Sequence, residues 1–282
     1  MQNGAENCVY KEIFVIGAGA MAEAFIRGMT ERKVLNPEKI HVVNRSRAER
    51  TELLSALYGV TIETSFEPAA ETDLVVVAVK PADVATALAA VQPFLHGQPV
   101  LSVAAGVTLN YLSEQISGCS PVVRTMPNIP VAVLAGSTAV SFSDGLSEEQ
   151  RQGIVFLLGQ LGEVVEIPED MMGAATALSG SGPGFVSYFL EAMENAAVSL
   201  GFSPEMARKL LLQTVVGTAK TLGEWGLSPA ELRQRVTSPG GTTHAGVSVM
   251  NEKDLGSTVL EALRAAAARS AEMGQQYAAM KK

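Results

Sequence analysis

The feature that most constrains the fold is a glycine-rich turn near the start of the sequence. Four apolar residues, 13–16, run directly into Gly17-Ala18-Gly19-Ala20-Met21-Ala22. This order is typical of a strand that turns sharply into a helix: Gly17 allows the turn, Gly19 permits close backbone approach to a diphosphate, and Ala22 replaces a third glycine. Since a helix N-terminus offers free N–H groups and a partial positive charge, the turn predicts a dinucleotide-binding domain.

Residues 11–167 repeat strand-like and helix-like segments. The apolar runs are nearly continuous, as expected for strands covered by helices on both faces. The βαβαβ pattern predicts an α/β, Rossmann-like, doubly wound parallel sheet. We expect strands at residues 11–16, 40–44, 74–79, 100–103 and 122–126, edge strands at 136–142 and 163–167, and helices at 21–32, 46–56 and 82–92.

The residue composition and hydrophobic pattern of the sequence change after Pro168. Strand-like runs end, and Ala, Leu, Met and Glu recur at helical spacing, which predicts helices at residues 172–200, 204–225, 229–236 and 255–280. Several of these helices are apolar on more than one face, which favours burial between subunits over a monomeric bundle. The sequence therefore predicts three parts: an N-terminal tail (1–10), a dinucleotide-binding domain (11–167) and an all-α domain for substrate binding and dimerisation (168–282).

Charge and cysteine content exclude several classes of function. The 282 residues carry a net charge of −8, which argues against a nucleic-acid-binding face. Cys8, Cys119 and three scattered histidines lack the spacing of a metal site, so no metal is expected. No apolar run approaches the roughly 20 residues of a membrane span. We therefore expect a protein of the reducing cytoplasm, with no membrane partner.

The turn after the second expected strand indicates which dinucleotide is bound. NAD-dependent domains usually place a carboxylate there, on the ribose hydroxyl, whereas this chain has Asn44-Arg45-Ser46-Arg47. Two arginines and a serine at the start of a helix favour a 2′-phosphate, and hence NADPH, with NADH as a weaker alternative. The other interpretation is a solvated helix face, because Arg47, Glu49 and Arg50 together resemble a protein surface.

Further cofactor-binding residues are expected where the later strands end, because ligands bind at the carboxyl edge of such sheets. Val79-Lys80-Pro81 ends the third strand, and the small residues Ala104 and Ala105, after the fourth, leave room for a flat nicotinamide ring. Arg124, on the fifth strand, is either a charge on the substrate side or half of a structural ion pair.

Two clusters of helix-breaking residues interrupt the expected helical domain. They are residues 177–184, Ala-Leu-Ser-Gly-Ser-Gly-Pro-Gly, and residues 236–243, Val-Thr-Ser-Pro-Gly-Gly-Thr-Thr. Glycine and proline are costly inside helices, up to about 3 kcal/mol for proline. Close helix crossing or a ligand at a helix N-terminus explains such clusters. The second cluster fits a ligand better, because threonine hydroxyls follow the glycines as a helix begins.

Together with residues 17–22, Val79-Lys80-Pro81 and Met126-Pro127-Asn128, the two clusters resemble the pyrroline-5-carboxylate reductase family. The Ser-Pro-Gly-Gly-x-Thr segment is highly specific, and the resemblance runs from about residue 11 to 278. It implies hydride transfer from NADPH to the C=N bond of 1-pyrroline-5-carboxylate, giving L-proline in the final step of proline biosynthesis. It also implies homodimers formed through the helical domain, often assembled into decamers.

Carried over by position, the resemblance implies roles for individual residues. The cofactor set combines the glycine turn, the strand ends and Asn128: Gly17, Gly19, Ala20, Met21, Asn44, Arg45, Ser46, Arg47, Val79, Lys80, Pro81, Ala104, Ala105 and Asn128. The substrate set consists of Ser238, Gly241, Thr242 and Thr243.

These residues suit the reduction of a cyclic imine. Backbone N–H groups of residues 241–243 at a helix N-terminus can hold a carboxylate, and Ser238 adds a hydroxyl. Thr243 is the expected catalytic contact, bonded to the ring nitrogen. Since a threonine hydroxyl is a weak acid, we expect it to orient the ring rather than protonate it, while the cofactor carries the chemistry.

Two other functions fit the two-domain pattern. A hydroxyacid dehydrogenase needs a base such as a lysine after a Gly-x-Gly segment, and this chain has no lysine between Gly184 and Lys209. An NADPH-binding sensor without catalysis would keep the same fold. Because an imine needs no such base, the sequence favours the reductase over both.

Overall fold

The computed structural model describes residues 9–45 and 48–279, and the side chains of 277–279 lie outside that description. The described chain forms two compact units: residues up to Ser181 with those from Ala265 onward, and residues 182–264. The predicted tail falls almost wholly outside the described residues. Strand β8 (Gly162–Glu166) is followed only by helices in the described chain, so residue 167 marks a change of secondary structure. As a domain boundary it stays a prediction.

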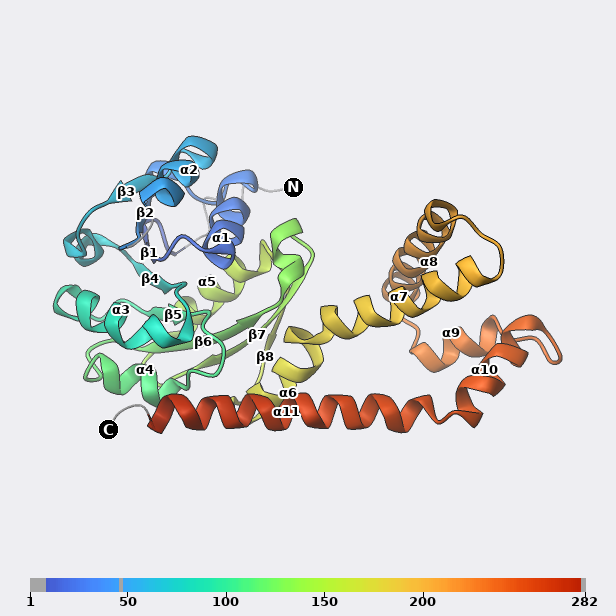
Figure 1. The fold of residues 1–282 in the computed structure, drawn as a ribbon. Coiled ribbons are helices and arrows are strands. Elements are labelled where there is room, and N and C mark those ends of the chain that lie inside the picture. Colours follow the sequence, from blue (N-terminus) through green and yellow to red (C-terminus); the bar gives the residue numbers. More distant parts are fainter. Residues whose placement is uncertain (1–8, 46–47, 280–282) are drawn as a thin grey trace. The chain divides into compact units, whose positions relative to one another are not determined.

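Among the described residues, the first unit contains one eight-stranded sheet of order β3-β2-β1-β4-β5-β6-β7-β8 (Figure 1). Neighbouring strands are parallel except β6 and β7. This order confirms the predicted doubly wound fold, in which the first strand lies inside the sheet. The strands are β1 (Ile13–Ile16), β2 (Ile40–Val43), β3 (Thr61–Glu63), β4 (Leu74–Val77), β5 (Val100–Ser102), β6 (Val122–Pro127), β7 (Gly136–Phe142) and β8.

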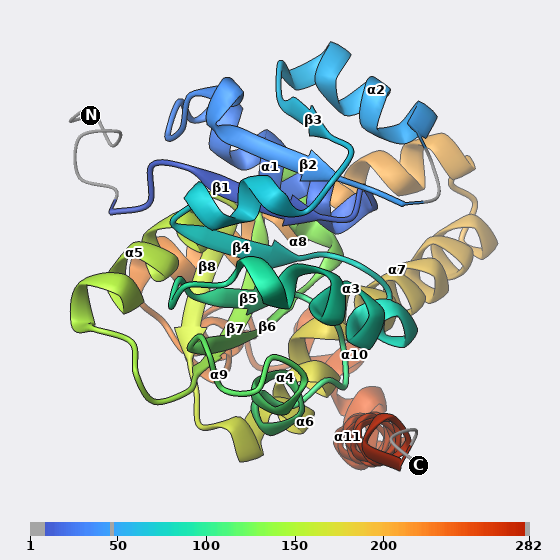
Figure 2. The same ribbon diagram turned by 90° about the vertical axis from the view of Figure 1, so that its left-hand side faces the viewer.

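Helices cover both faces of this sheet (Figure 2). Ile13 and Val15 of β1 belong to the core beneath α1 and α5, whereas Phe14 and Ile16 belong to the core beneath α3 and α4. Because successive side chains of a strand point to opposite faces, four consecutive apolar residues are buried on both sides. The α-helices that precede β8 are α1 (Ala20–Glu31), α2 (Ala48–Tyr58), α3 (Val84–Val91), α4 (Leu109–Gln115) and α5 (Glu148–Gly159).

Every strand predicted from an apolar run is present, with ends that differ by one or two residues at most. The sequence patterns do not predict β3, α4 or α5. Strand β3 has only three residues and half-buried side chains, so it lacks a recognisable period. Helix α5 did carry a usable signal: Ser147 and Gln150 form a capping box at its start.

The helix predicted at residues 172–200 is interrupted at its Gly/Ser/Pro cluster, as expected. Helix α6 (Met172–Ala175) passes into a π-helical turn, Thr176–Gly180, before α7 (Gly182–Ser199) begins. The interruption follows from Pro183, which has no N–H to continue the helical hydrogen bonds.

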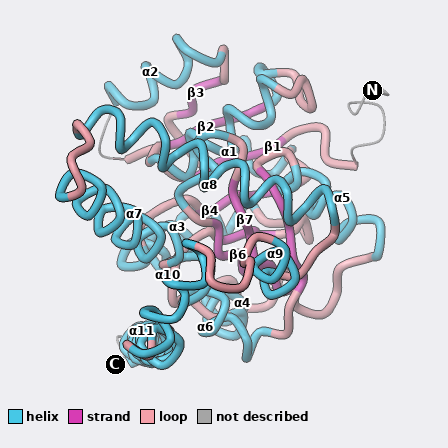
Figure 3. Tube along the Cα trace, turned by 90° about the vertical axis from the view of Figure 1, so that its right-hand side faces the viewer, coloured by secondary structure: helices cyan, strands magenta, loops and turns pink. Residues whose placement is uncertain are grey.

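The second unit contains helices and no strand between residues 182 and 264 (Figure 3). The predicted helix restarts at Ser203 and Ser228 are confirmed, because each serine hydroxyl accepts an N–H of the following helix and a proline occupies its first turn. Its helices are α7, α8 (Pro204–Trp225), α9 (Pro229–Arg235), α10 (Thr242–Glu252) and the first part of α11 (Leu255–Ala279).

Helices α7 and α8 leave large apolar side chains exposed. Tyr188 is 76% exposed, Leu210 57% and Trp225 60%. Arg208 of α8 bonds both carboxylate oxygens of Glu194 of α7, and this hydrogen bonding lowers the pKa of Glu194. No described helix is long and apolar enough to cross a membrane. The exposed side chains fit the expectation that these helices pack against another subunit.

The buried position of α3 generates a stability prediction. Leu88 of α3 is fully buried, whereas Leu57 of α2 is 58% exposed. We expect L88A to lower the free energy of unfolding by about 2–5 kcal/mol through cavity formation, and the chemically identical L57A to lower it by less than about 1 kcal/mol. Urea denaturation followed by circular dichroism measures both. Equal losses would contradict the assignment of Leu88 to the core.

Candidate functional site

The glycine-rich turn lies between the carboxyl end of β1 and the start of α1. Gly17 has a φ of +110°, and a Cβ there would lie 2.5 Å from the carbonyl oxygen of Ala78. The Gly17 N–H donates to the carbonyl of Val43 at 2.8 Å, which ties the turn to the end of β2. No side chain fits at Gly17, so the sequence signal has a steric cause.

Gly19 leaves the start of α1 open. It is the N-cap of α1 and has no side chain with which to cap the helix. A Cβ at Gly19 would meet no atom within 4 Å. Ala20 and Met21 are the first residues of α1, where backbone N–H groups have no partner within the helix. Open space beside an uncapped helix N-terminus is what a diphosphate requires.

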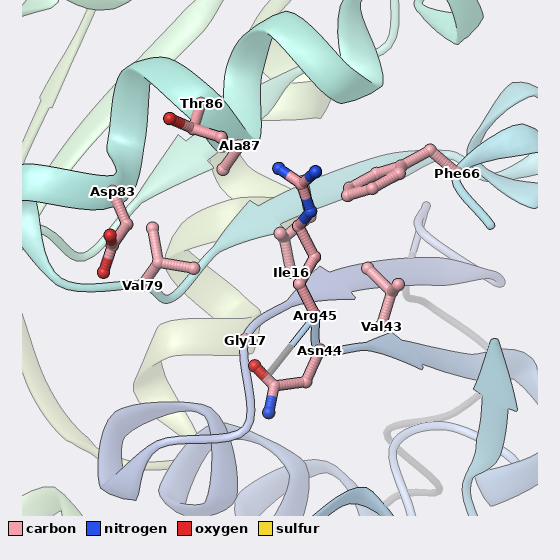
Figure 4. Close-up of a pocket in the computed structure, with 10 residues that line it drawn as sticks. All are labelled: Ile16, Gly17, Val43, Asn44, Arg45, Phe66, Val79, Asp83, Thr86 and Ala87. Carbon is pink, nitrogen blue, oxygen red and sulfur yellow. The ribbon is translucent and has the colours of Figure 1, made fainter. Parts of the chain in front are cut away.

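Two adjoining cavities follow the carboxyl edge of the sheet from this turn, and together we call them the edge groove. The first, of about 290 Å³ (Figure 4), is lined by Ile16, Gly17, Val43, Asn44, Arg45, Phe66, Val79, Asp83, Thr86 and Ala87. The second, of about 220 Å³, is lined by Gly17, Ala18, Gly19, Asn44, Ala78, Val79, Lys80 and Asp83. The two cavities adjoin at Gly17, Asn44, Val79 and Asp83, which line both.

Charged side chains that follow two strand ends line the edge groove. Arg45 follows β2, and in Figure 4 its side chain extends past the ring of Phe66 towards α3. Lys80 and Asp83 follow β4. Asp83 and Thr86 are lining residues that the sequence reasoning missed, although Pro81 marks the same helix start and so offered a signal.

A cluster of polar side chains supports the glycine turn. Glu23 of α1 pairs with Arg50 of α2, and the Arg50 Nε donates to the carbonyl of Ala18 at 3.0 Å. The Tyr58 hydroxyl donates to Glu23 at 3.3 Å, and burial, followed by the Glu23 charge, raises the pKa of Tyr58. Arg50 is thus tied to the turn, contrary to the interpretation of α2 as only a solvated face.

Arg124 forms an ion pair with Glu169, which agrees with the structural alternative left by the sequence. It lies on β6 with 8% of its surface exposed, and its guanidinium donates to Glu169 Oε1 at 3.0 Å. The same carboxylate oxygen accepts the Leu109 N–H at 2.6 Å. The pair therefore joins β6 to the start of α4 and to the segment before α6.

Asn128 directly follows β6, and both ends of its side-chain amide are bonded within the protein. Oδ1 accepts the Ser137 N–H at 2.8 Å. Nδ2 donates to the carbonyl and hydroxyl oxygens of Ser179 at 3.3 and 3.4 Å. Asn128 therefore connects the end of β6 to β7 and to the π-helical turn.

The second unit carries the Ser-Pro-Gly-Gly-Thr-Thr segment at the start of α10. Gly240 has a φ of +71°, and Gly241 is the N-cap. A Cβ at Gly241 would contact the hydroxyl of Ser238, so a side chain there would displace that hydroxyl. Thr242 and Thr243 form the first turn and receive no side-chain cap from Gly241. This start of α10 is therefore suited to an anion.

The structure brings part of the predicted site together. The edge groove is lined by Gly17, Gly19, Asn44, Arg45, Val79 and Lys80, with Ala20, Met21 and Pro81 adjacent in the chain. Ser46 and Arg47 lie outside the described residues. Ala104, Ala105 and Asn128 follow β5 and β6, outside the lining of these two cavities. Ser238, Gly241, Thr242 and Thr243 share the start of α10. Their roles in binding stay predictions.

The glycine turn, the uncapped start of α1 and the edge groove of a mainly parallel sheet define a dinucleotide-binding protein. No group of His, Cys, Asp and Glu in the described chain is arranged to hold a metal ion. Two family models match this chain, one in each half. "NADP oxidoreductase coenzyme F420-dependent" matches residues 12–106, and "Pyrroline-5-carboxylate reductase dimerisation" matches residues 169–273. The class is thus that of the NAD(P)-dependent oxidoreductases.

Relatives place the chain more narrowly. Pyrroline-5-carboxylate reductase 2 of Bacillus subtilis is 35% identical over 95% of this chain and 97% of its own. The Arabidopsis thaliana enzyme is 38% identical over 92% and 94%. The solved structure of the Coxiella burnetii enzyme matches with a TM-score of 0.89 and 33% identity, covering 93% of this chain and 98% of that one. The chain belongs to the pyrroline-5-carboxylate reductase family, which confirms the predicted resemblance.

Gly17 and Gly19 generate contrasting predictions. G17A forces a side chain against the Ala78 carbonyl, so we expect it to lower the melting temperature and NADPH binding together. G19A meets no protein atom and should fold normally, but its methyl group occupies the proposed diphosphate space and should weaken NADPH binding at least about tenfold. Differential scanning fluorimetry and NADPH fluorescence titration separate the two effects. Wild-type affinity in G19A would contradict this placement of the diphosphate.

Proposed function

We propose that this chain reduces 1-pyrroline-5-carboxylate to L-proline with NADPH, the final step of proline biosynthesis. The observation that carries the proposal is its similarity to named pyrroline-5-carboxylate reductases over 92–95% of the chain. The edge groove supports the cofactor half of the proposal, and the open start of α10 supports the substrate half.

The residues of the edge groove fit NADPH. The open space at Gly19 accommodates a diphosphate, and Arg45 can pair with a 2′-phosphate that no carboxylate at the end of β2 repels. A related Plasmodium falciparum enzyme, 27% identical with a TM-score of 0.83 over 94% of this chain and 98% of its own, was solved with NADP bound. When bound, NADPH supplies the hydride from its nicotinamide ring. NADH lacks the 2′-phosphate and should bind more weakly.

The start of α10 is proposed to hold the substrate. Backbone N–H groups of Thr242 and Thr243, together with the helix dipole, would bind its carboxylate, and Ser238 would add a hydroxyl. The Thr243 hydroxyl is the proposed contact to the ring nitrogen. Because a threonine hydroxyl gives up its proton reluctantly, its role is to orient the ring, while the imine takes its proton from solution. Correct alignment of the reacting atoms lowers the activation barrier by several kcal/mol.

The proposal extends to assembly and compartment. The dimerisation model matches residues 169–273, and helices α7 and α8 expose the apolar side chains that a homodimer would bury. Assembly of dimers into a decamer and a cytoplasmic location are further parts of the proposal, taken from the family resemblance and from the sequence composition.

One assay tests the reaction against its rivals. Purified protein is incubated with NADPH and pyrroline-5-carboxylate, and separately with a hydroxyacid and NADP⁺, while absorbance at the nicotinamide band is followed. We expect oxidation of NADPH in the first mixture alone. NADP⁺ reduction by the hydroxyacid would indicate a dehydrogenase, and NADPH binding without any turnover would indicate a sensor.

Thr243 provides the first mechanistic prediction. T243A removes the hydroxyl that orients the imine, so we expect kcat to fall by about 10- to 100-fold, the cost of a few kcal/mol in the barrier, with NADPH affinity intact. T61A, which removes a β3 hydroxyl that donates to the Glu38 carbonyl, serves as the control. Steady-state kinetics and NADPH titration measure both variants. A wild-type kcat in T243A would remove Thr243 from the mechanism.

Arg45 provides a prediction on cofactor selectivity. R45A removes the cation proposed to meet the 2′-phosphate, so we expect the KM for NADPH to rise about tenfold, in line with one lost charge-assisted contact. The KM for NADH should stay within about twofold, since NADH has no phosphate there. R32A, an exposed arginine at the end of α1, is the control. An equal rise in both KM values would show that Arg45 does not bind the 2′-phosphate of NADPH.

A further inference from the structure

The π-helical turn Thr176–Gly180 has a cause in the sequence. In a regular helix the Ser179 carbonyl accepts the N–H of residue 183, but Pro183 has no N–H and its ring displaces that carbonyl. The helix widens instead, and the Ser181 N–H donates to the Thr176 carbonyl, five residues back, at 2.8 Å. Such π-helical turns are rare in proteins, and those that exist frequently lie at functional sites.

Asn128 supplies the donor that the Ser179 carbonyl lacks. Its Nδ2 donates to that carbonyl at 3.3 Å and reaches the Ser179 hydroxyl oxygen at 3.4 Å. Its Oδ1 accepts the Ser137 N–H at 2.8 Å, and its own N–H donates to the Ser137 carbonyl at 3.2 Å. One residue therefore fixes the π-helical turn to β7 and to the end of β6.

A second contact holds the turn at the same place. A Cβ at Gly180 would lie 2.5 Å from the terminal methyl of Met126, so the turn packs closely on β6. Ser102, the last residue of β5, pairs with Arg124 of β6, which puts Met126 and Asn128 beyond the end of β5. This is the carboxyl edge of the sheet, where Ala104 also follows β5 and where the nicotinamide is expected.

We infer that Asn128 is a positioning residue for hydride transfer. It acts through the π-helical turn, by holding the segment that carries Ser179 and Ser181 at the edge of the sheet where reduction takes place. A displacement of about 1 Å in reacting geometry can cost on the order of 100-fold in rate. This inference rests on the proposed function, but its structural part does not: the amide holds the turn whichever reaction the protein catalyses.

The variant N128D tests this role with a minimal change. It keeps an oxygen for the Ser137 N–H, removes the donor to the Ser179 carbonyl, and places a carboxylate oxygen against that carbonyl. We expect kcat at saturating NADPH to fall about tenfold or more, a loss that a role in cofactor binding alone would not produce. With NADPH deuterated at the transferred position, the isotope effect on kcat should increase. Hydrogen exchange at the Ser181 amide should accelerate.

The matched control is N110D. Asn110 is exposed on α4 and donates to Glu114 at 2.7 Å, so this variant makes the same chemical change, with the same added charge, away from the π-helical turn. Its kcat, isotope effect and Ser181 exchange should match wild type.

Two results for N128D would overturn the inference. One is wild-type kcat with an unchanged isotope effect. The other is a fall in activity that only follows a loss of folded protein by circular dichroism, with the isotope effect unchanged. If the wild-type protein does not reduce pyrroline-5-carboxylate, the proposed function fails by itself. The exchange rate of the Ser181 amide then decides whether Asn128 holds the turn.

Discussion

The edge groove depends on one close approach of backbone to backbone at Gly17. The absence of a side chain there lets the turn lie against the Ala78 carbonyl, and the Gly17 N–H bonds the Val43 carbonyl. Since Ala78 follows β4 and Val43 ends β2, the turn connects the carboxyl ends of three neighbouring strands. The side chains that line the groove come from those ends. A single residue without a Cβ thus fixes where Asn44, Arg45 and Val79 converge.

The two proposed anion sites share a form of helix start that sets them apart from several other helices. Helices α4, α5, α8 and α9 are capped by Thr108, Ser147, Ser203 and Ser228, whose hydroxyls accept first-turn N–H groups. Helices α1 and α10 have glycine N-caps, Gly19 and Gly241, which accept nothing. A hydroxyl cap would satisfy the donors that a phosphate or carboxylate needs. Glycine at these two positions therefore gives up some helix stability and keeps the donors available.

The sequence predicts the fold well because buried strands and glycine turns are local signals. Residues 13–22 alone specify strand, turn and helix, and the apolar runs locate the other long strands. The sequence does not predict the hydrogen-bond partners of Asn128 and Arg124. Asn128 meets Ser179 across 51 residues of sequence, and Arg124 meets Glu169 across 45. No periodicity encodes such pairs, since they exist only after the sheet has formed. Asp83 and Thr86 are intermediate in how well the sequence predicts them. No pattern singles them out, but a strand end and Pro81 mark the start of the helix that carries them.

The state of Arg124 bears on the kind of catalysis proposed. It is the charged side chain among the buried residues of the described chain, and it lies on the strand that leads to Met126 and Asn128. Its charge is balanced by Glu169, which is also held by the Leu109 N–H. The pair thus joins β6 to the start of α4 and to the segment before α6. This strand therefore contributes rigidity to the edge of the sheet. That suits a reduction in which the imine is protonated from solution and the protein's task is alignment.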